Sequence, residues 1–174
     1  MNEPAGQGER DGASRGIVIG PGEGRTIPGT DAITLKATSE ETGGSIGAFE
    51  DVSSPGDGPP RHVHYGSDEL FYVLEGEFLI LVGERQESVS AGIYVFVPRG
   101  TLHAYKVIGT ERGRVFSAFI PGVPERAFEE FVKFRTEGEE VNRSARRSRT
   151  VAQMNELFAE INEKYDSEFV GPPL

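Results

Sequence analysis

The chain contains no cysteine. It therefore has no disulfide framework, no thiolate ligand for a metal ion and no catalytic thiol. Long apolar runs are also missing, and no window approaches the length of a membrane-spanning helix. The first residues, MNEPAGQGERDGASRG, lack the apolar core of a signal peptide. We therefore expect a cytoplasmic protein with no membrane partner and a disordered leader over residues 1–14.

Positive charge is scarce. The chain has 18 Lys and Arg against 28 Asp and Glu, a formal net charge of −10 and a sequence pI near 4.8. Such a balance argues against an extended nucleic-acid footprint, so we expect no nucleic-acid partner. We interpret the one basic cluster as a solvated loop ahead of a helix; it comprises Arg143, Arg146, Arg147 and Arg149.

Glycine and proline, by contrast, are abundant, with 23 and 11 residues among 174. Frequent Gly and Pro residues favour short strands joined by tight turns, and we predict about ten such strands between residues 16 and 120. Residues 69–74 and 77–82 are typical of a hairpin that turns at Glu75-Gly76. The nearly continuous apolar run Ile93–Val97 predicts a strand buried on both faces. The whole pattern indicates a sandwich or small barrel.

After Pro121 the apolar spacing changes to that of helices. One helix is predicted over Glu125–Phe134, and a second over residues 150–165, opened by a capping box at Thr150 and Gln153. The apolar tail, residues 169–174, is expected to pack back onto the body. We therefore expect a single domain over residues 15–174, with a β-barrel over about 15–121 and a helical extension over about 122–174.

The chain has three histidines, confined to two short stretches. His62 and His64 are two residues apart, so on an extended strand both point to one face. A hairpin can bring the Glu69 carboxylate back against them, and His103 follows a tight turn. Three imidazoles and a carboxylate suit Ni, Fe, Mn, Co, Cu or Zn, and leave positions open for water, substrate or dioxygen. The spacing does not choose the ion, and a structural metal or histidines without metal are the alternatives.

Two spaced motifs carry a resemblance to a known superfamily. The first reads Gly56-x5-His62-x-His64-x4-Glu69-x6-Gly76, and the second reads Gly92-x5-Pro98-x-Gly100-x2-His103. Together they resemble the cupin motifs; the Asn that ends the second motif is Val107 here. The resemblance implies an all-β core, a cupin double-stranded β-helix (a jelly-roll-like barrel) followed by two C-terminal α-helices. It also implies one divalent transition metal ion bound by His62, His64, Glu69 and His103.

Among cupins, a single domain with two C-terminal helices and a terminal Gly-Pro-Pro is similar to bacterial quercetinase-like proteins. These include flavonol dioxygenases that use Ni, Co, Mn or Fe. The resemblance implies a metal-dependent dioxygenase acting on a flavonol or a related aromatic or polyketide-like enol. Glu69 would then be both metal ligand and catalytic base. Tyr105 shares its strand face with His103, and Phe71 and Val73 share parity with Glu69, so we expect these three in the substrate pocket; ordinary barrel packing is the alternative for them.

Two other functions stay open at this point. A non-oxidative cupin, such as an isomerase, cyclase or decarboxylase, would use the metal as a Lewis acid. A non-enzymatic cupin would only bind a small molecule inside the barrel. In each case the partner is a small molecule, and a homodimer is expected because cupins often pair strand edges between subunits.

Overall fold

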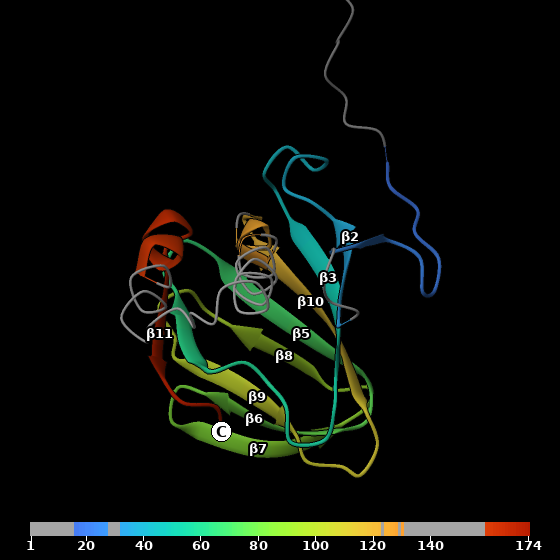
Figure 1. Cartoon of the computed structure of the whole chain (residues 1–174), viewed down its shortest axis with the longest axis vertical. Coiled ribbons are helices and arrows are strands. Elements are labelled where there is room, and N and C mark those ends of the chain that lie inside the picture. Colours follow the sequence, from blue (N-terminus) through green and yellow to red (C-terminus); the bar gives the residue numbers. More distant parts are fainter. Residues whose placement is uncertain (1–15, 28–31, 123, 129, 131–158) are drawn as a thin grey trace, which may run out of the picture.

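The computed structural model describes residues 16–27, 32–122, 124–128, 130 and 159–174. Within them the chain forms two antiparallel sheets, which Figure 1 shows facing each other as the two walls of a barrel. The six-stranded sheet has the order β1 (Arg25–Thr26), β2 (Ile33–Ala37), β3 (Gly47–Ser53), β10 (Gly113–Ile120), β5 (Asp68–Glu75), β8 (Tyr94–Val97). The five-stranded sheet has the order β11 (Ser167–Gly171), β4 (Arg61–His64), β9 (His103–Val107), β6 (Glu77–Val82), β7 (Arg85–Ser90). The barrel predicted from the turn-rich sequence is confirmed.

Alternating side chains divide each central strand between the barrel interior and the outside. In β5, Glu69, Phe71 and Val73 are buried, while Leu70 and Tyr72 are partly or largely exposed. This period of two is what a strand with one core face requires. Phe71 and Val73 pack in the main hydrophobic core with residues of both sheets, including Phe78, Ile80 and Val107.

The expected hairpin at Glu75-Gly76 is wrong. β5 pairs with β10 and β8, whereas β6 pairs with β7 and β9, so the chain crosses here from one sheet to the other. Gly76 has φ 86°, and a Cβ at this position would lie 2.8 Å from the Gly113 Cα. Glycine is therefore required both by the backbone conformation and by the close approach of a neighbouring chain segment.

The prediction that Ile93–Val97 is buried on both faces is also wrong. β8 is an edge strand of the six-stranded sheet, and Tyr94 and Phe96 are 58% and 48% exposed. Only Val97 of this strand is fully buried. Tyr94 and Phe96 stand opposite Tyr72 and Leu70 of β5. We call these four residues, Leu70, Tyr72, Tyr94 and Phe96, the outer aromatic face.

The described C-terminal residues return to the barrel as predicted. Helical residues are found at 126–128 and 130 and at 159–164, inside the two predicted helices. β11 then pairs with β4, which carries two of the histidines (Figure 1). The leader, the capping box at Thr150 and Gln153 and the arginine cluster lie outside the described residues.

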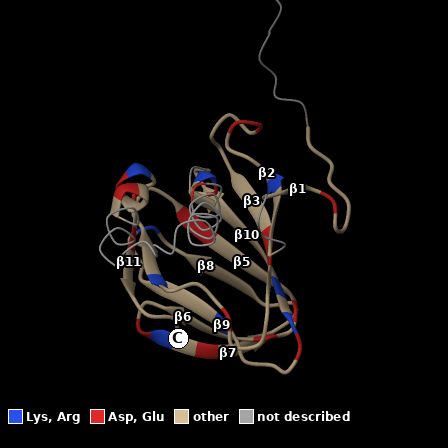
Figure 2. Ribbon diagram, viewed as in Figure 1, with Lys and Arg blue, Asp and Glu red and all other residues tan. Residues whose placement is uncertain are grey.

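The described residues contain no helix that is long and apolar enough to cross a membrane. Figure 2 shows their Lys and Arg residues scattered among Asp and Glu along the ribbon. This is the arrangement of a mixed-charge surface.

Candidate metal centre

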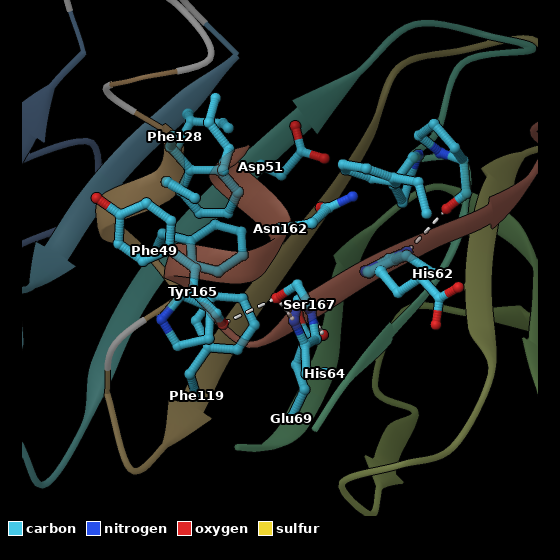
Figure 3. A pocket seen from close by; sticks show the side chains of 18 of the residues that line it. Phe49, Asp51, His62, His64, Glu69, Phe119, Phe128, Asn162, Tyr165 and Ser167 are labelled. Carbon is cyan, nitrogen blue, oxygen red and sulfur yellow. Dashed lines mark hydrogen bonds and ion pairs between the residues drawn. The ribbon is translucent and has the colours of Figure 1, made fainter. Parts of the chain in front are cut away.

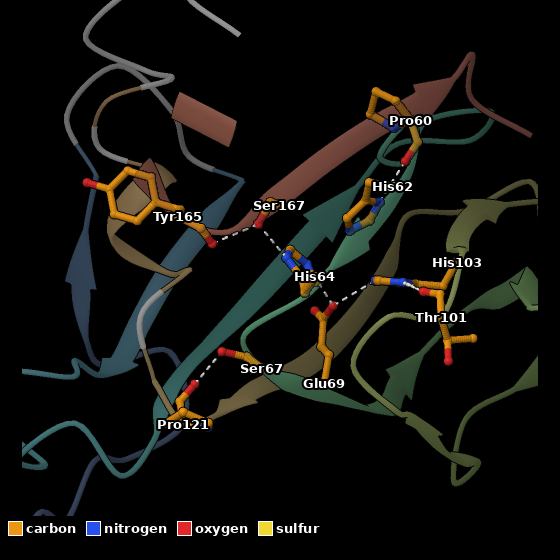
Figure 4. Close-up of polar contacts among 10 residues, drawn as sticks. All are labelled: Pro60, His62, His64, Ser67, Glu69, Thr101, His103, Pro121, Tyr165 and Ser167. Carbon is orange, nitrogen blue, oxygen red and sulfur yellow. Dashed lines mark hydrogen bonds and ion pairs between the residues drawn. The ribbon is translucent and has the colours of Figure 1, made fainter. Parts of the chain in front are cut away.

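The two sheets bring the four predicted ligands together. His62 and His64 lie on β4, His62 is opposite His103 of the neighbouring β9, and Glu69 faces them from β5 of the other sheet. One ligand atom from each residue lies within 4.8 Å of all the others. All four residues are buried. The carboxylate therefore approaches the histidines across the barrel (Figure 4), and not through a hairpin as expected.

Each imidazole is oriented through its Nδ1 atom. His62 Nδ1 donates to the Pro60 carbonyl over 2.7 Å, and His103 Nδ1 donates to the Thr101 carbonyl over 2.9 Å. His64 Nδ1 lies 2.8 Å from Ser167 Oγ, which itself donates to the Tyr165 carbonyl. The serine oxygen therefore accepts from His64, and all three histidines carry their proton on Nδ1. This leaves the Nε2 lone pairs for a metal ion, the arrangement common among metal-binding histidines.

The inward-facing atoms fit a cation. His103 Nε2 and Glu69 Oε2 are 2.9 Å apart, although both are acceptors when the His103 proton is on Nδ1. His64 Nε2 is 3.3 Å from the same carboxylate oxygen, and it is buried with no hydrogen bond to any described residue. Acceptor atoms at such distances need a shared proton or a cation between them. The donor set suits a divalent transition metal ion.

Burial and mutual interaction control the protonation of this cluster. Burial, followed by repulsion from the two other imidazoles, lowers the pKa of His62 to about 3. Burial alone would raise the pKa of Glu69, but its interactions with His103 and His64 outweigh that cost and lower the pKa to about 2. At neutral pH, His62 is therefore neutral and Glu69 is ionised, the states that metal ligands require.

The turn before β9, which contains Arg99 and Gly100, holds the ligand strands in position. The Asp68 carboxylate accepts hydrogen bonds from the backbone and the guanidinium of Arg99, at 2.8–3.1 Å, and so ties the turn before β9 to the start of β5. The Gly100 amide donates to the His64 carbonyl over 2.7 Å. Val107, which replaces the expected Asn, is 1% exposed and packs in the main core. The four ligands are therefore brought together although Val107 stands where the motif has Asn.

A cavity of about 270 Å³ opens directly onto this cluster. Of the three residues expected in a substrate pocket, Tyr105 and Phe71 line this cavity, whereas Val73 is fully buried in the core and is not among the described lining residues. Most of the wall is aromatic and apolar, with Phe49, Phe119 and Phe128 in mutual ring contact (Figure 3). Such a pocket suits one small ligand that is flat and largely apolar.

Several residues of the cavity were not anticipated. Asp51, on β3, shares its inward parity with Phe49, so an acidic residue at an inward strand position was the available signal. Its carboxylate accepts hydrogen bonds from Tyr105 Oη and Ser53 Oγ. Burial raises the pKa of Asp51 against the effect of these two bonds. The C-terminal segment adds Asn162, Tyr165, Ser167 and Phe169, for which the sequence held no comparable signal.

The charged side chains in the described part of the cavity lining are acidic. Among the described residues that line the cavity, Asp51, Glu69 and Glu168 are acidic and none is Lys or Arg. The described part of the lining therefore offers no fixed cationic side chain to a carboxylate or phosphate.

Known proteins share both the sequence pattern and the fold. Residues 52–119 match the family model described as Cupin domain. A quercetin 2,3-dioxygenase of Bacillus subtilis is 35% identical over 103 residues. That alignment covers 58% of this chain but only 30% of the relative's length.

Solved structures extend the likeness in fold. A predicted oxalate decarboxylase of Thermotoga maritima is 20% identical, with a TM-score of 0.50 over 51% of this chain and 78% of its own. An RmlC-like cupin of Shewanella frigidimarina is also 20% identical, with a TM-score of 0.51 over 65% of this chain and 98% of its own. Residues 52–119 therefore resemble a cupin domain, and the chain resembles quercetinase-like proteins of the cupin superfamily.

Proposed function

We propose that this protein is a metal-dependent dioxygenase of the quercetinase-like kind, acting on a flavonol or a related aromatic enol. The observation that carries the proposal is a four-ligand cluster on the wall of an aromatic cavity whose described lining contains no Lys or Arg. The partial relationship to a quercetin 2,3-dioxygenase supports the same reaction class. Because fold alone does not define function, the proposal depends on the site.

In this proposal His62, His64, His103 and Glu69 hold one divalent transition metal ion. When bound, the ion would supply Lewis acidity toward a substrate hydroxyl and redox chemistry toward dioxygen. The aromatic wall binds the flat body of the substrate and excludes water. Phe49 and Phe128 meet edge to face at a centroid distance of 4.7 Å, an arrangement of aromatic rings that a bound aromatic can extend.

Glu69 is proposed to accept the proton of the substrate hydroxyl on its carboxylate. With a pKa of about 2 it is ionised at neutral pH but is a weak base. It would therefore take a proton efficiently only from a hydroxyl that is itself acidic. Its two roles, ligand and base, compete, so the carboxylate must loosen when the substrate binds.

Oxygen uptake by the metal-loaded protein with added flavonol tests the proposal. The expected result is flavonol-dependent uptake that falls about 100-fold in Glu69→Gln. The metal content of that variant is measured in parallel, because lost metal alone would also abolish turnover. Substrate conversion without oxygen uptake would replace the proposal by a non-oxidative isomerase, cyclase or decarboxylase. Flavonol binding without any turnover would replace it by a binding module.

We further propose that the protein is a cytoplasmic homodimer. The outer aromatic face supports the dimer, because Tyr72, Tyr94 and Phe96 are each more than 40% exposed on a single sheet surface beside an edge strand. Contiguous apolar surface of this kind is usually covered by a partner.

A further inference from the structure

A second polar group stands in the cavity, apart from the metal cluster. In the view of Figure 3, Asp51 and Asn162 lie above Ser167, and His64 and Glu69 lie below it. Tyr105, which is hydrogen-bonded to Asp51, is two residues from His103 on β9. Two residues along a strand correspond to about 6.7 Å, so a ligand of two or three rings can reach both groups.

The hydrogen bonds inside this group leave acceptor atoms for a ligand. Within the described residues, both side-chain hydrogen bonds of Asp51, from Tyr105 and from Ser53, end on Oδ2. Its other carboxylate oxygen and the Tyr105 hydroxyl oxygen remain as acceptors. The Asn162 side-chain oxygen is buried and has no hydrogen-bond partner among the residues that the structure describes. A buried acceptor without a donor is costly, so the Asn162 oxygen favours a ligand that donates a hydrogen bond, and the two other oxygens can accept from the same ligand.

The charge of the cavity further limits the class of ligand that can bind. A carboxylate or phosphate placed beside Asp51 would meet acceptor oxygens and would find no Lys or Arg in the described lining. Like-charge contact in a buried site is strongly unfavourable. A neutral hydroxyl donates to the same atoms without that cost.

We propose that Asp51, Tyr105 and Asn162 form a hydroxyl-recognition site that selects aromatic ligands with a second hydroxyl group, remote from the oxygen that binds at the metal cluster. The inference rests on the proposed function for the choice of ligand class, but it concerns recognition and not turnover. Asp51 is here a specificity-determining residue, held in place by Ser53 and Tyr105.

Binding of matched ligands to the metal-loaded protein, measured by calorimetry, tests this site. The probes are 3-hydroxyflavone, its derivatives with one added hydroxyl at the 7 or 4′ position, and the corresponding carboxylates. The expected result is that at least one added hydroxyl lowers Kd about 10-fold, because a hydrogen bond to a buried charged acceptor is strong. The carboxylate at the same position is expected to raise Kd about 10-fold relative to 3-hydroxyflavone.

Two variants assign the preference to Asp51. Asp51→Asn keeps the shape but replaces an acceptor by a donor, while the double variant Asp51→Leu with Tyr105→Phe removes both partners, so that neither is left unpaired. Both are expected to reduce the preference for the added hydroxyl to less than about 2-fold, measured against the Kd of 3-hydroxyflavone in the same variant. Glu50→Gln, the outward-facing neighbour on β3, is the matched control and should keep the preference.

A preference that survives in both variants, or a wild-type protein that does not distinguish the probes, overturns the inference and leaves the proposed dioxygenase untouched. If the protein shows the expected hydroxyl preference but consumes no oxygen, the recognition site is supported and the dioxygenase proposal is wrong. If the wild-type protein binds none of the probes, both proposals fall.

Discussion

Ser167 Oγ lies 2.8 Å from His64 Nδ1, although the two residues are separated by 103 positions in the sequence. The serine hydroxyl donates to the Tyr165 carbonyl and so accepts the imidazole proton. Strand β11 thereby fixes both the orientation and the tautomer of a histidine on β4. The C-terminal segment is in this way part of the candidate metal centre as well as part of its cavity.

Ser167→Ala is expected to weaken metal binding about 10-fold, because His64 loses the acceptor that holds its proton on Nδ1. Competition with a chromophoric chelator measures this affinity. Ser167→Thr keeps the hydroxyl and should restore most of the binding, and Ser88→Ala, on the exposed strand β7, should have no effect. Equal affinities for the Ser167→Ala variant and the wild-type protein would show that β11 does not orient the ligand.

The metal-free protein should lose stability as the pH falls below about 6.5. The pKa of His62 is lowered on folding to about 3, and that of Glu69 to about 2. The unfolded chain therefore binds more protons than the folded one, and stability is complete only above the unfolded pKa values. Between pH 6 and 5 the slope from His62 approaches about 1.4 kcal/mol per pH unit.

Urea unfolding of the metal-free protein at several pH values checks that slope. His62→Gln removes the titrating group and should flatten the profile between pH 6 and 5. The account of the cluster's protonation would be contradicted by a wild-type profile as flat as that of the variant.

Gly58 is expected to tolerate no side chain. A Cβ at this position would lie 1.9 Å from the Tyr105 carbonyl oxygen, so Gly58→Ala must push the loop before β4 away from β9. We expect a loss of about 2–3 kcal/mol in the free energy of unfolding. Gly56→Ala should cost about 1–2 kcal/mol, since Gly56 has φ 86° and open space around it. Denaturant unfolding of both variants, with Gly16→Ala as an unstrained control, tests this order.

The outer aromatic face provides a test of assembly. We expect Tyr94→Asp together with Phe96→Asp to convert a dimer into a monomer, because buried carboxylates would replace apolar contacts. Light scattering coupled to gel filtration gives the mass. Ser88→Asp, on the exposed β7, should leave the dimer unchanged. A wild-type monomer, or a dimer that the double variant retains, would rule out this face as the interface.

The candidate ligands could be predicted from the sequence because local geometry determines them. The spacing of His62 and His64 places both on one strand face, and parity placed Tyr105 and Phe71 in the cavity. Glu69 was correctly grouped with the histidines, but through a hairpin that does not form. Sheet membership depends on long-range strand pairing, which a turn at Gly76 does not reveal. For the same reason Ile93–Val97 was expected to be buried on both faces. The strand instead lies at the edge of its sheet and exposes Tyr94 and Phe96.

Residues from distant segments could not be placed in this way. Ser167 and Asn162 reach the site only because the chain returns to β4 after the C-terminal helical residues, and no local pattern specifies that return. Asp51 is different, since its inward parity with Phe49 was visible in the sequence. A charged residue at an inward strand position is in itself a functional signal.

Metal analysis of the purified protein tests the central claim most directly. The account predicts one transition metal ion per chain, and its loss when His103→Ala removes a ligand that is 1% exposed at the centre of the cluster. Mass-spectrometric metal counting against protein concentration gives this ratio. A wild-type protein that carries no stoichiometric transition metal, even after incubation with Ni, Fe, Mn, Co, Cu and Zn salts, would contradict the account.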